Sequence, residues 1–244
     1  IDGGSYRLFI LSDVTRIKEL EILKGHIISV VSHELKTPLT SIQGFSEILA
    51  DKLEGKMKNF ADIIHRESER LARFLNMFLD ITRIEEGRQP IKMAPVNLNN
   101  VIREVASALK PIGDKNSITI NTDIPEKTDD ITVDIDLTKQ CIYNLVENAI
   151  KYSPSGNDVI IRLTDTKEHL AIDIIDHGYG IKEEDIKKVF EKFYRSSSDK
   201  TKNIKGSGLG LTFVKEAVEA QGGRLALTSV YGEGSTFSII FPRG

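Results

Sequence analysis

The chain has 244 residues, of which 40% are hydrophobic and 28% charged, a composition typical of globular proteins with one or two domains. Its formal net charge of −3 argues against nucleic-acid binding, which usually requires a basic domain. Cys141 is the single cysteine, so no disulfide can form within the chain. No stretch approaches the ~20 apolar residues of a membrane helix, and we expect no membrane contact in this segment. Because the chain begins at Ile1, we expect it to be a fragment of a longer protein.

The first segment, residues 1–15, has the pattern of one β-strand after a pair of glycines. A single strand cannot form a domain, so this strand is interpreted as the end of a preceding domain. From about residue 14 to residue 50, apolar residues recur three, four or seven positions apart. This spacing predicts a long helix, with a kink where Pro38 removes a backbone donor.

A second helix is predicted after a short turn at residues 52–57, and it ends near Gly87 and Pro90. Two long helices joined by a short turn form an antiparallel hairpin, here assigned to residues 16–89. A hairpin cannot cover both of its apolar faces. We therefore expect it to pair with a second copy as a four-helix bundle.

A linker at residues 90–95 precedes a region, residues 96–244, where helical and strand patterns are mixed. Helices are predicted at residues 97–109, 136–152, 183–190 and 211–220, and strands at 117–121, 132–134, 159–164, 170–176, 225–229 and 235–241. Since helices and strands do not alternate strictly, the pattern favours an α/β sandwich over a Rossmann-type fold.

The segment Ser32–Pro38 places His33 beside Glu34 on the first predicted helix. If the apolar residues of this helix face inward, His33 points to solvent. A neighbouring carboxylate can accept the Nδ1 proton of an imidazole and leave the Nε2 lone pair free to attack. A solvated histidine next to a solvated glutamate is the alternative interpretation.

A second polar motif lies on the helix predicted at residues 136–152. Asn144, Asn148 and Lys151 are four and three residues apart, so they share one helix face. Asparagine is unfavourable inside helices. Its presence suggests an amide oxygen that binds Mg²⁺ beside an ammonium that binds phosphate. The alternative is a pair of surface amides.

Asp176 ends an apolar strand and begins the sequence Asp-His-Gly-Tyr-Gly-Ile. A carboxylate at a strand end can accept a hydrogen bond from an adenine amino group, and Gly178 and Gly180 allow the backbone to approach a ligand closely. A tight turn without ligand would use the same residue types.

The glycine-rich segment Gly206–Leu211 leads into a predicted helix. Such turns present backbone N–H groups and the positive end of the helix dipole to phosphate. The spacing is not that of a dinucleotide-binding fingerprint. The preceding polar residues 196–203 are interpreted as a mobile lid or as an ordinary surface loop.

In this order, the motifs resemble those of the sensor histidine kinases of two-component systems, over residues 21–241. Five motifs resemble the family's H-box, N-box, G1 box, F-box and G2 box, which correspond here to residues 32–38, 144–152, 176–181, 190–195 and 206–211. Residues 1–15 are similar to the exit of a PAS sensor domain.

The resemblance implies an α-helical hairpin that dimerises as a four-helix bundle, followed by an α/β sandwich of the Bergerat ATP-binding type. It implies that His33 is the phosphoacceptor and Glu34 its acid/base partner. The phosphoryl group would pass to an aspartate of a response regulator receiver domain. Thr37 would orient a water molecule that dephosphorylates this regulator. A cytoplasmic location follows from the same resemblance, with any membrane anchor outside the fragment.

The resemblance also implies ATP and Mg²⁺ as cofactors. Asn148 would hold Mg²⁺, Asp176 would bind adenine, and Lys151 would contact phosphate. The implied nucleotide site consists of Asn144, Asn148, Lys151, Tyr152, Asp176, Gly178, Gly180, Gly206, Ser207, Gly208, Leu209 and Gly210.

Two other functions use the same kind of nucleotide fold. An ATP-driven conformational machine, related to chaperone or topoisomerase ATPases, would hydrolyse ATP with water. A catalytically silent module would bind nucleotide and partners only. An acid-labile phosphoprotein distinguishes the kinase from both.

Overall fold

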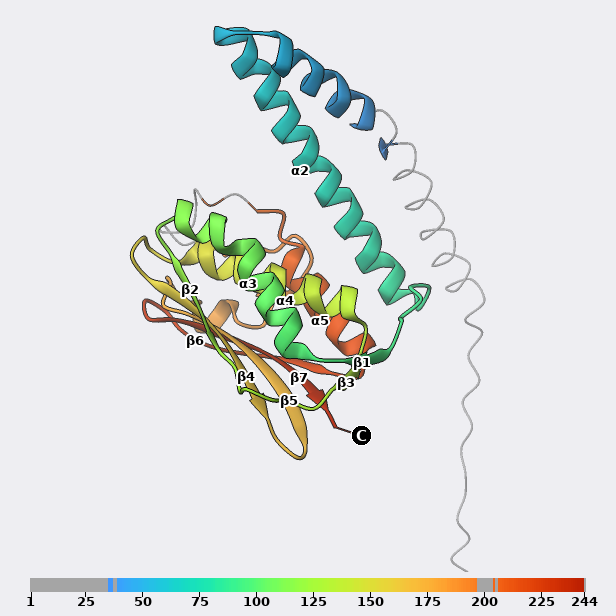
Figure 1. Ribbon diagram of the computed structural model, residues 1–244, viewed down its shortest axis with the longest axis vertical. Helices are drawn as coiled ribbons and strands as arrows, with labels where there is room; N and C mark the ends of the chain where they lie inside the picture. Colours follow the sequence, from blue (N-terminus) through green and yellow to red (C-terminus); the bar gives the residue numbers. More distant parts are fainter. Residues whose placement is uncertain (1–34, 37–38, 197–203, 205, 244) are drawn as a thin grey trace, which may run out of the picture. The chain divides into compact units, whose positions relative to one another are not determined.

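The computed structural model describes residues 35–36, 39–196, 204 and 206–243 (Figure 1). The chain divides into two compact units, Ile1–Leu75 and Asn76–Gly244. The predictions for residues 1–15, for Pro38 and for the His33 segment lie outside the described residues. The division between the units falls at residues 75–76, within the continuous helix Gly55–Glu85. The predicted domain boundaries therefore stay predictions.

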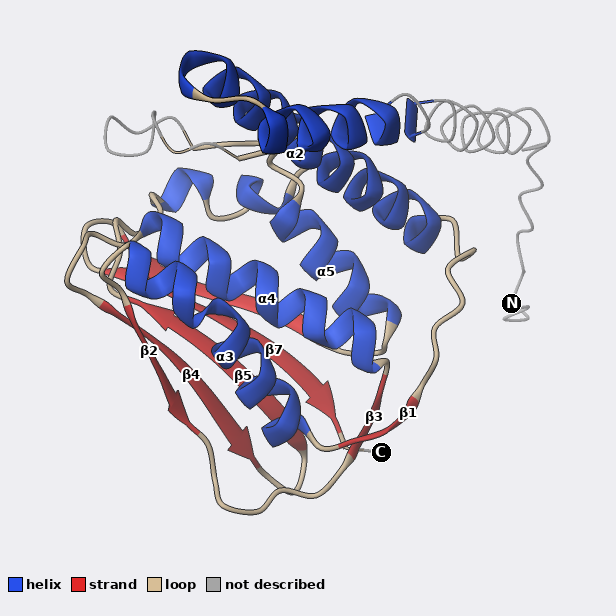
Figure 2. Ribbon diagram, turned by 45° about the horizontal axis from the view of Figure 1, so that its top comes forward, coloured by secondary structure: helices blue, strands red, loops and turns tan. Residues whose placement is uncertain are grey.

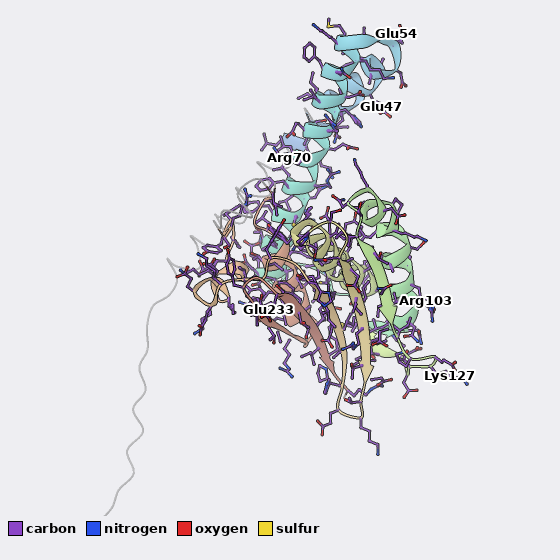
Figure 3. All side chains as sticks on the ribbon, turned by 90° about the vertical axis from the view of Figure 1, so that its left-hand side faces the viewer. Glu47, Glu54, Arg70, Arg103, Lys127 and Glu233 are labelled. Atoms are coloured by element: carbon purple, nitrogen blue, oxygen red, sulfur yellow. The ribbon has the colours of Figure 1, made fainter. Side chains whose placement is uncertain are left out.

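The described part of the first unit is the predicted helical hairpin. A helix over residues 39–52 precedes α2 (Gly55–Glu85), and residues 53–54 form the turn, shorter than predicted. Leu39, Ala61 and Ser46 are buried between the two helices. Charged side chains such as Glu47 and Glu54 project into solvent (Figure 3).

The second unit contains a mixed sheet covered on one face by helices (Figure 2). Its strands are β1 (Ala94–Val96), β2 (Thr119–Asp123), β3 (Ile131–Val133), β4 (Asp158–Asp165), β5 (His169–Asp176), β6 (Arg224–Val230) and β7 (Gly234–Pro242). Its helices are α3 (Leu98–Lys115), α4 (Ile135–Tyr152) and α5 (Gly210–Ala220), with the 3₁₀ turns η1 (Glu183–Asp185) and η2 (Lys188–Phe190).

The main sheet has the strand order β2-β4-β5-β7-β6, and β1 pairs with β3 in a separate two-stranded sheet. Only the β2–β4 pair of the main sheet is parallel. Alternate residues of β4, such as Val159 and Ile161, are buried on the face of the sheet that α4 covers. Phe213 of α5 is fully buried as well. The predicted α/β sandwich is therefore confirmed.

Several local predictions differ from the structure. The sequence assigns residues 94–95 to the linker, yet they form β1 together with Val96, which is buried where β1 pairs with β3. The helix predicted at residues 183–190 is instead η1 and η2. The helix predicted at residues 97–109 continues through Pro111 to Lys115, since Gly113 extends its buried face.

No described helix combines the length and the apolar character that a membrane span requires.

Candidate functional site

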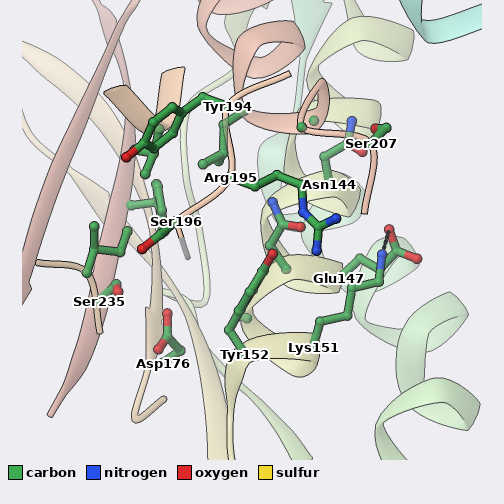
Figure 4. A pocket seen from close by; sticks show the side chains of 18 of the residues that line it. Asn144, Glu147, Lys151, Tyr152, Asp176, Tyr194, Arg195, Ser196, Ser207 and Ser235 are labelled. Atoms are coloured by element: carbon green, nitrogen blue, oxygen red, sulfur yellow. Dashed lines mark ion pairs between the residues drawn. The ribbon is translucent and has the colours of Figure 1, made fainter. Parts of the chain in front are cut away.

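A cavity of about 190 Å³ lies beside α4, the end of β5 and the glycine-rich turn before α5 (Figure 4). The predicted site residues that line it are Asn144, Asn148, Lys151, Tyr152, Asp176, Gly180, Ser207, Gly208 and Gly210. Three motifs that are far apart in sequence thus meet around one cavity.

Helix α4 supplies the polar floor of the cavity. Asp134 caps the helix, because its Oδ1 accepts hydrogen bonds from the N–H groups of Asp136 and Leu137 at 3.0 and 3.1 Å. Asn144 is 8% exposed, and its Nδ2 has no hydrogen-bond partner among the described residues. Because an unpaired buried amide is costly, this donor indicates a ligand or a bound water.

Lys151 lies in the last turn of α4. Its Nζ is 3.0 Å from Glu147 Oε2, and Figure 4 shows this pair at the cavity wall. Both side chains are about a third exposed, so the pair is screened by water and adds little stability. The ammonium group therefore remains able to turn toward an anion in the cavity.

Asp176 stands at the end of β5, with Ser235 of β7 as its cross-strand neighbour. Burial raises the pKa of Asp176, and hydrogen bonds from the backbone N–H groups of Gly178 and Ser235 partly oppose this rise. The Gly178 N–H donates to Asp176 Oδ1 at 2.9 Å. A buried carboxylate aimed at the cavity is suited to accept a hydrogen bond from a ligand.

Three residues of the predicted nucleotide site do not line the cavity: Gly178, Gly206 and Leu209. A Cβ atom at Gly178 would collide with the carbonyl oxygen of Tyr152, so this glycine serves close packing of the turn. Leu209 is fully buried and precedes α5. Gly206 is exposed, and a Cβ atom there would meet nothing within 4 Å.

The glycine-rich turn approaches other backbone closely at Gly208. Its φ is 72°, and a Cβ atom would lie 2.7–2.9 Å from backbone atoms of Phe193 and Tyr194. The Phe193 N–H donates to Gly208 O at 3.0 Å. At Gly210, a Cβ atom would lie 3.8 Å from the amides of Asn144 and Asn148. The absence of side chains at these positions keeps this end of the cavity open.

Arg195 and Glu147 also line the cavity, although the sequence motifs did not predict a role for them. The Arg195 guanidinium extends toward Asn144 and Tyr152 (Figure 4). Burial raises the pKa of Tyr152, and the positive charge of Arg195 opposes this rise. The sequence signal for Arg195 is its place in the F-box-like segment, residues 190–195.

His33, Glu34 and Thr37 lie outside the described residues, as do positions 197–203 of the predicted lid. His177 does not line the cavity. Its Nδ1 lies 3.1 Å from Asp158 Oδ1 at the surface. This arrangement indicates that His177 is part of the turn and is not a ligand contact.

The cavity fits a nucleotide by its chemistry. Its apolar lining residues are Met77, Ala149, Ile181, Val189, Leu211 and Phe237. These offer an apolar bed for a base, with Asp176 to orient it. Lys151, Arg195 and the N-terminal end of α5 offer positive charge to phosphate, and we call this region the phosphate end.

No group of three or more acidic, histidine or cysteine side chains in the described part of the chain could hold a metal by itself. Mg²⁺ commonly uses one or two protein oxygens together with phosphate oxygens and water. The amide of Asn148 can supply one such oxygen, so the residues fit Mg²⁺ that arrives with a nucleotide.

Comparisons with known proteins agree with this geometry. Residues 23–87 match the His Kinase A (phospho-acceptor) domain, and residues 133–244 match the histidine kinase-, DNA gyrase B- and HSP90-like ATPase family. The sensor histidine kinase WalK of Bacillus subtilis (strain 168) is 29% identical over 250 residues, which cover 99% of this chain and 40% of the relative. The sensor-like histidine kinase SenX3 of Mycolicibacterium smegmatis is 30% identical over 243 residues, 99% of this chain and 63% of the relative.

Solved structures show the same fold. Full-length ShkA in complex with AMPPNP superimposes with a TM-score of 0.78 at 23% identity, covering 88% of this chain and 45% of that chain. The histidine kinase ThkA in complex with the response regulator protein TrrA superimposes with a TM-score of 0.62 at 25% identity, covering 94% and 64%.

The chain spans between 40% and 63% of the length of the two curated relatives named above. It carries both of the matched domains in the order expected from the motifs. The chain belongs to the sensor histidine kinases of two-component systems.

Proposed function

We propose that this chain transfers the γ-phosphoryl group of ATP to His33, and from there to an aspartate of a response regulator receiver domain. The observation that carries the proposal is the cavity in which the buried Asp176 faces the amides of α4 and the cations of the phosphate end. The complex of the related ThkA with a response regulator supports the choice of partner.

For nucleotide binding, we assign adenine to the Asp176 carboxylate and the phosphates to the phosphate end. Lys151 and Arg195 would neutralise the charge on the phosphate oxygens, and the backbone of residues 206–210 would donate N–H groups. Mg²⁺ bound with the nucleotide would supply further charge neutralisation, with Asn148 as its protein ligand. Asn144 and Tyr152 would complete the wall of the pocket.

For phosphoryl transfer, the Nε2 lone pair of His33 attacks the γ-phosphorus. The bond from nitrogen to phosphorus forms as the bond from phosphorus to the bridging oxygen breaks, and ADP leaves. Glu34 accepts the Nδ1 proton or balances the imidazolium charge. Positioning and charge neutralisation supply most of the acceleration in reactions of this class.

The test is incubation of the chain with Mg²⁺ and γ-labelled ATP. We expect label on the protein that survives base but not acid, and no label on the His33→Gln variant. His65→Gln is the matched control, because His65 lies in the same hairpin and should leave labelling intact. Release of free phosphate at equal rates by wild type and His33→Gln would instead favour an ATP-hydrolysing machine.

We also propose that the chain dephosphorylates its regulator, with Thr37 orienting the attacking water. Thr37 lies four residues after His33, which is one turn of the helix that the sequence predicts there. Thr37→Ala should keep autophosphorylation and lose dephosphorylation of the phosphorylated regulator. Dephosphorylation at the wild-type rate would exclude this role.

We propose a homodimer through the hairpin. Large apolar side chains of the hairpin are exposed in the single chain, among them Leu35, Ile42, Phe45, Ile48, Leu49, Met57, Phe60, Ile63, Ile64 and Leu71. Monomeric proteins rarely leave so many apolar side chains in water. The PAS-like segment at residues 1–15, the domain boundaries and the cytoplasmic location stay predictions.

A further inference from the structure

The carboxylate of Asp185 binds two hydroxyl groups that flank Arg195. Asp185 ends the 3₁₀ turn η1 and is 8% exposed. Its Oδ1 accepts a hydrogen bond from the Tyr194 hydroxyl at 2.6 Å, and its Oδ2 accepts one from the Ser196 hydroxyl at 2.5 Å. Each carboxylate oxygen therefore holds one of the two residues next to Arg195.

These hydrogen bonds are of the strong, charge-assisted kind. The bonds from Ser196 and Tyr194, with a smaller contribution from the positive charges of Lys188 and Lys182, hold the pKa of Asp185 below its usual range. The same contact raises the pKa of Tyr194 to about 12. At neutral pH the carboxylate is charged and both hydroxyls are protonated, so both bonds are present.

The backbone around Arg195 is not part of a helix or strand. Just before it, Phe193 has a φ of 65°, and its N–H is bonded to Gly208. A non-glycine residue in the left-handed region persists only where its surroundings hold it. The direction of the chain at residues 194–196 is thus set by Gly208 on one side and by Asp185 on the other.

This arrangement orients the arginine. In Figure 4 the Tyr194 hydroxyl is directed to one side, whereas the Arg195 guanidinium extends to the other, toward Asn144 and Tyr152. Arg195 is exposed and also donates to the backbone oxygen of Ile204. A binding loop loses backbone and side-chain entropy when it binds phosphate, and a backbone that is already fixed removes the first of these two costs.

We infer that Asp185 is a positioning residue for ATP, which acts through Tyr194 and Ser196 to keep the Arg195 guanidinium at the phosphate end of the cavity. The inference rests on the proposed function. Asp185 itself does not line the cavity, whereas Tyr194, Arg195 and Ser196 do. Any effect of Asp185 on a bound nucleotide therefore passes through this segment, and the double variant below tests whether it passes through Arg195.

The test compares binding of ATP and of adenosine to the chain by titration calorimetry in the presence of Mg²⁺. Asp185→Asn should weaken ATP binding by roughly tenfold, the order expected for one charge-assisted contact, and leave adenosine binding unchanged. Arg195→Gln should show the same selectivity. In the double variant Asp185→Asn/Arg195→Gln, the loss of ATP affinity should equal that of Arg195→Gln alone.

Glu183→Gln is the matched control, because Glu183 is an exposed carboxylate in the same 3₁₀ turn. It should bind ATP as the wild type does. If Asp185→Asn fails to fold, Tyr194→Phe/Ser196→Ala removes the same two hydrogen bonds while it keeps the carboxylate, and it should show the same selective loss.

The outcomes separate the inference from the proposed function. Additive losses in the double variant, equal losses for ATP and adenosine, or unchanged ATP affinity in Asp185→Asn would each overturn the positioning role while ATP binding by the wild type stands. A wild-type chain that does not bind ATP would overturn the proposed function, and the inference with it.

Discussion

The carboxyl group of Asp176 is buried, so its ionisation costs free energy. Burial raises its pKa, so the folded state holds the proton to a higher pH than the unfolded chain does. As pH rises from the ordinary pKa of aspartate to the raised value, the unfolded chain loses its proton first and the free energy of unfolding falls. A residue that lowers stability at neutral pH and lines a cavity is a candidate for function.

We expect Asp176→Asn to weaken ATP binding by roughly 10–100-fold, because the new amide N–H₂ opposes the adenine amino group. The same change should remove the fall in unfolding free energy that the wild type shows between acidic and neutral pH. Titration calorimetry and denaturant unfolding at several pH values measure the two effects. Asp129→Asn, at an exposed position, is the control for both. ATP affinity equal to that of the wild type would refute the adenine contact.

Gly208 offers a second test at the scale of one residue. Gly208→Ala should destabilise the second unit by about 1–3 kcal/mol, since a side chain is strained at positive φ and its Cβ would press on the Phe193 backbone. Thermal unfolding measures the change. Gly206→Ala is the control for stability, because its Cβ has open space. Equal unfolding temperatures for the two variants would contradict the close approach.

At the scale of elements, Asp134 joins three segments at the start of α4. Its carboxylate caps α4 and also accepts a hydrogen bond from the Lys92 N–H at 2.7 Å, while its own N–H donates to Gln221 after α5 at 2.8 Å. The helix that carries Asn144 and Asn148 is therefore anchored to the segment before β1 and to the end of α5.

Asp134→Ala should lower the free energy of unfolding by about 1–2 kcal/mol, because α4 loses its cap and the Lys92 N–H loses its acceptor. Denaturant unfolding measures the loss. Asp136→Ala is the matched control: Asp136 is exposed in the first turn and contributes only through the helix dipole, less than about 1 kcal/mol. A smaller effect at Asp134 than at Asp136 would show that the cap is not the anchor.

At the scale of the whole molecule, the two units differ in how they bury apolar surface. The second unit covers its sheet with its own helices, and residues such as Ile172 and Phe213 are fully buried. In the hairpin, Phe45 and Phe60 remain 69% and 58% exposed. A second copy of the hairpin can remove such side chains from water.

Phe60→Glu should convert a dimer into a monomer, since a charge on the apolar face of the hairpin cannot be buried without a large cost. Sedimentation velocity measures the change of mass. Met93→Glu places the same charge at an exposed apolar position of the second unit, 44% exposed, and should leave the dimer intact. Dimers of equal affinity for both variants would place the interface elsewhere.

The elements that the sequence alone predicted have periodic apolar patterns. The repeat in the hairpin, the run of α4 and the alternation of β4 and β5 are local signals, because each depends only on which side chains face a common core. The order of the motifs along the chain is also a property of the sequence alone, and it predicted the family. The polar face of α4 was predictable because Asn144, Asn148 and Lys151 are neighbours on any helix.

Tertiary structure decided which of the predicted residues line the cavity. Gly178 and Leu209 belong to binding motifs, but they pack the turn and the core, while Arg195 and Glu147 line the cavity. β1 exists only because β3, some 35 residues later, offers a partner. These outcomes depend on contacts between distant segments, such as Gly208 with Phe193 and Asp185 with Tyr194. No local pattern contains them, since they form only when the packed core brings those segments together.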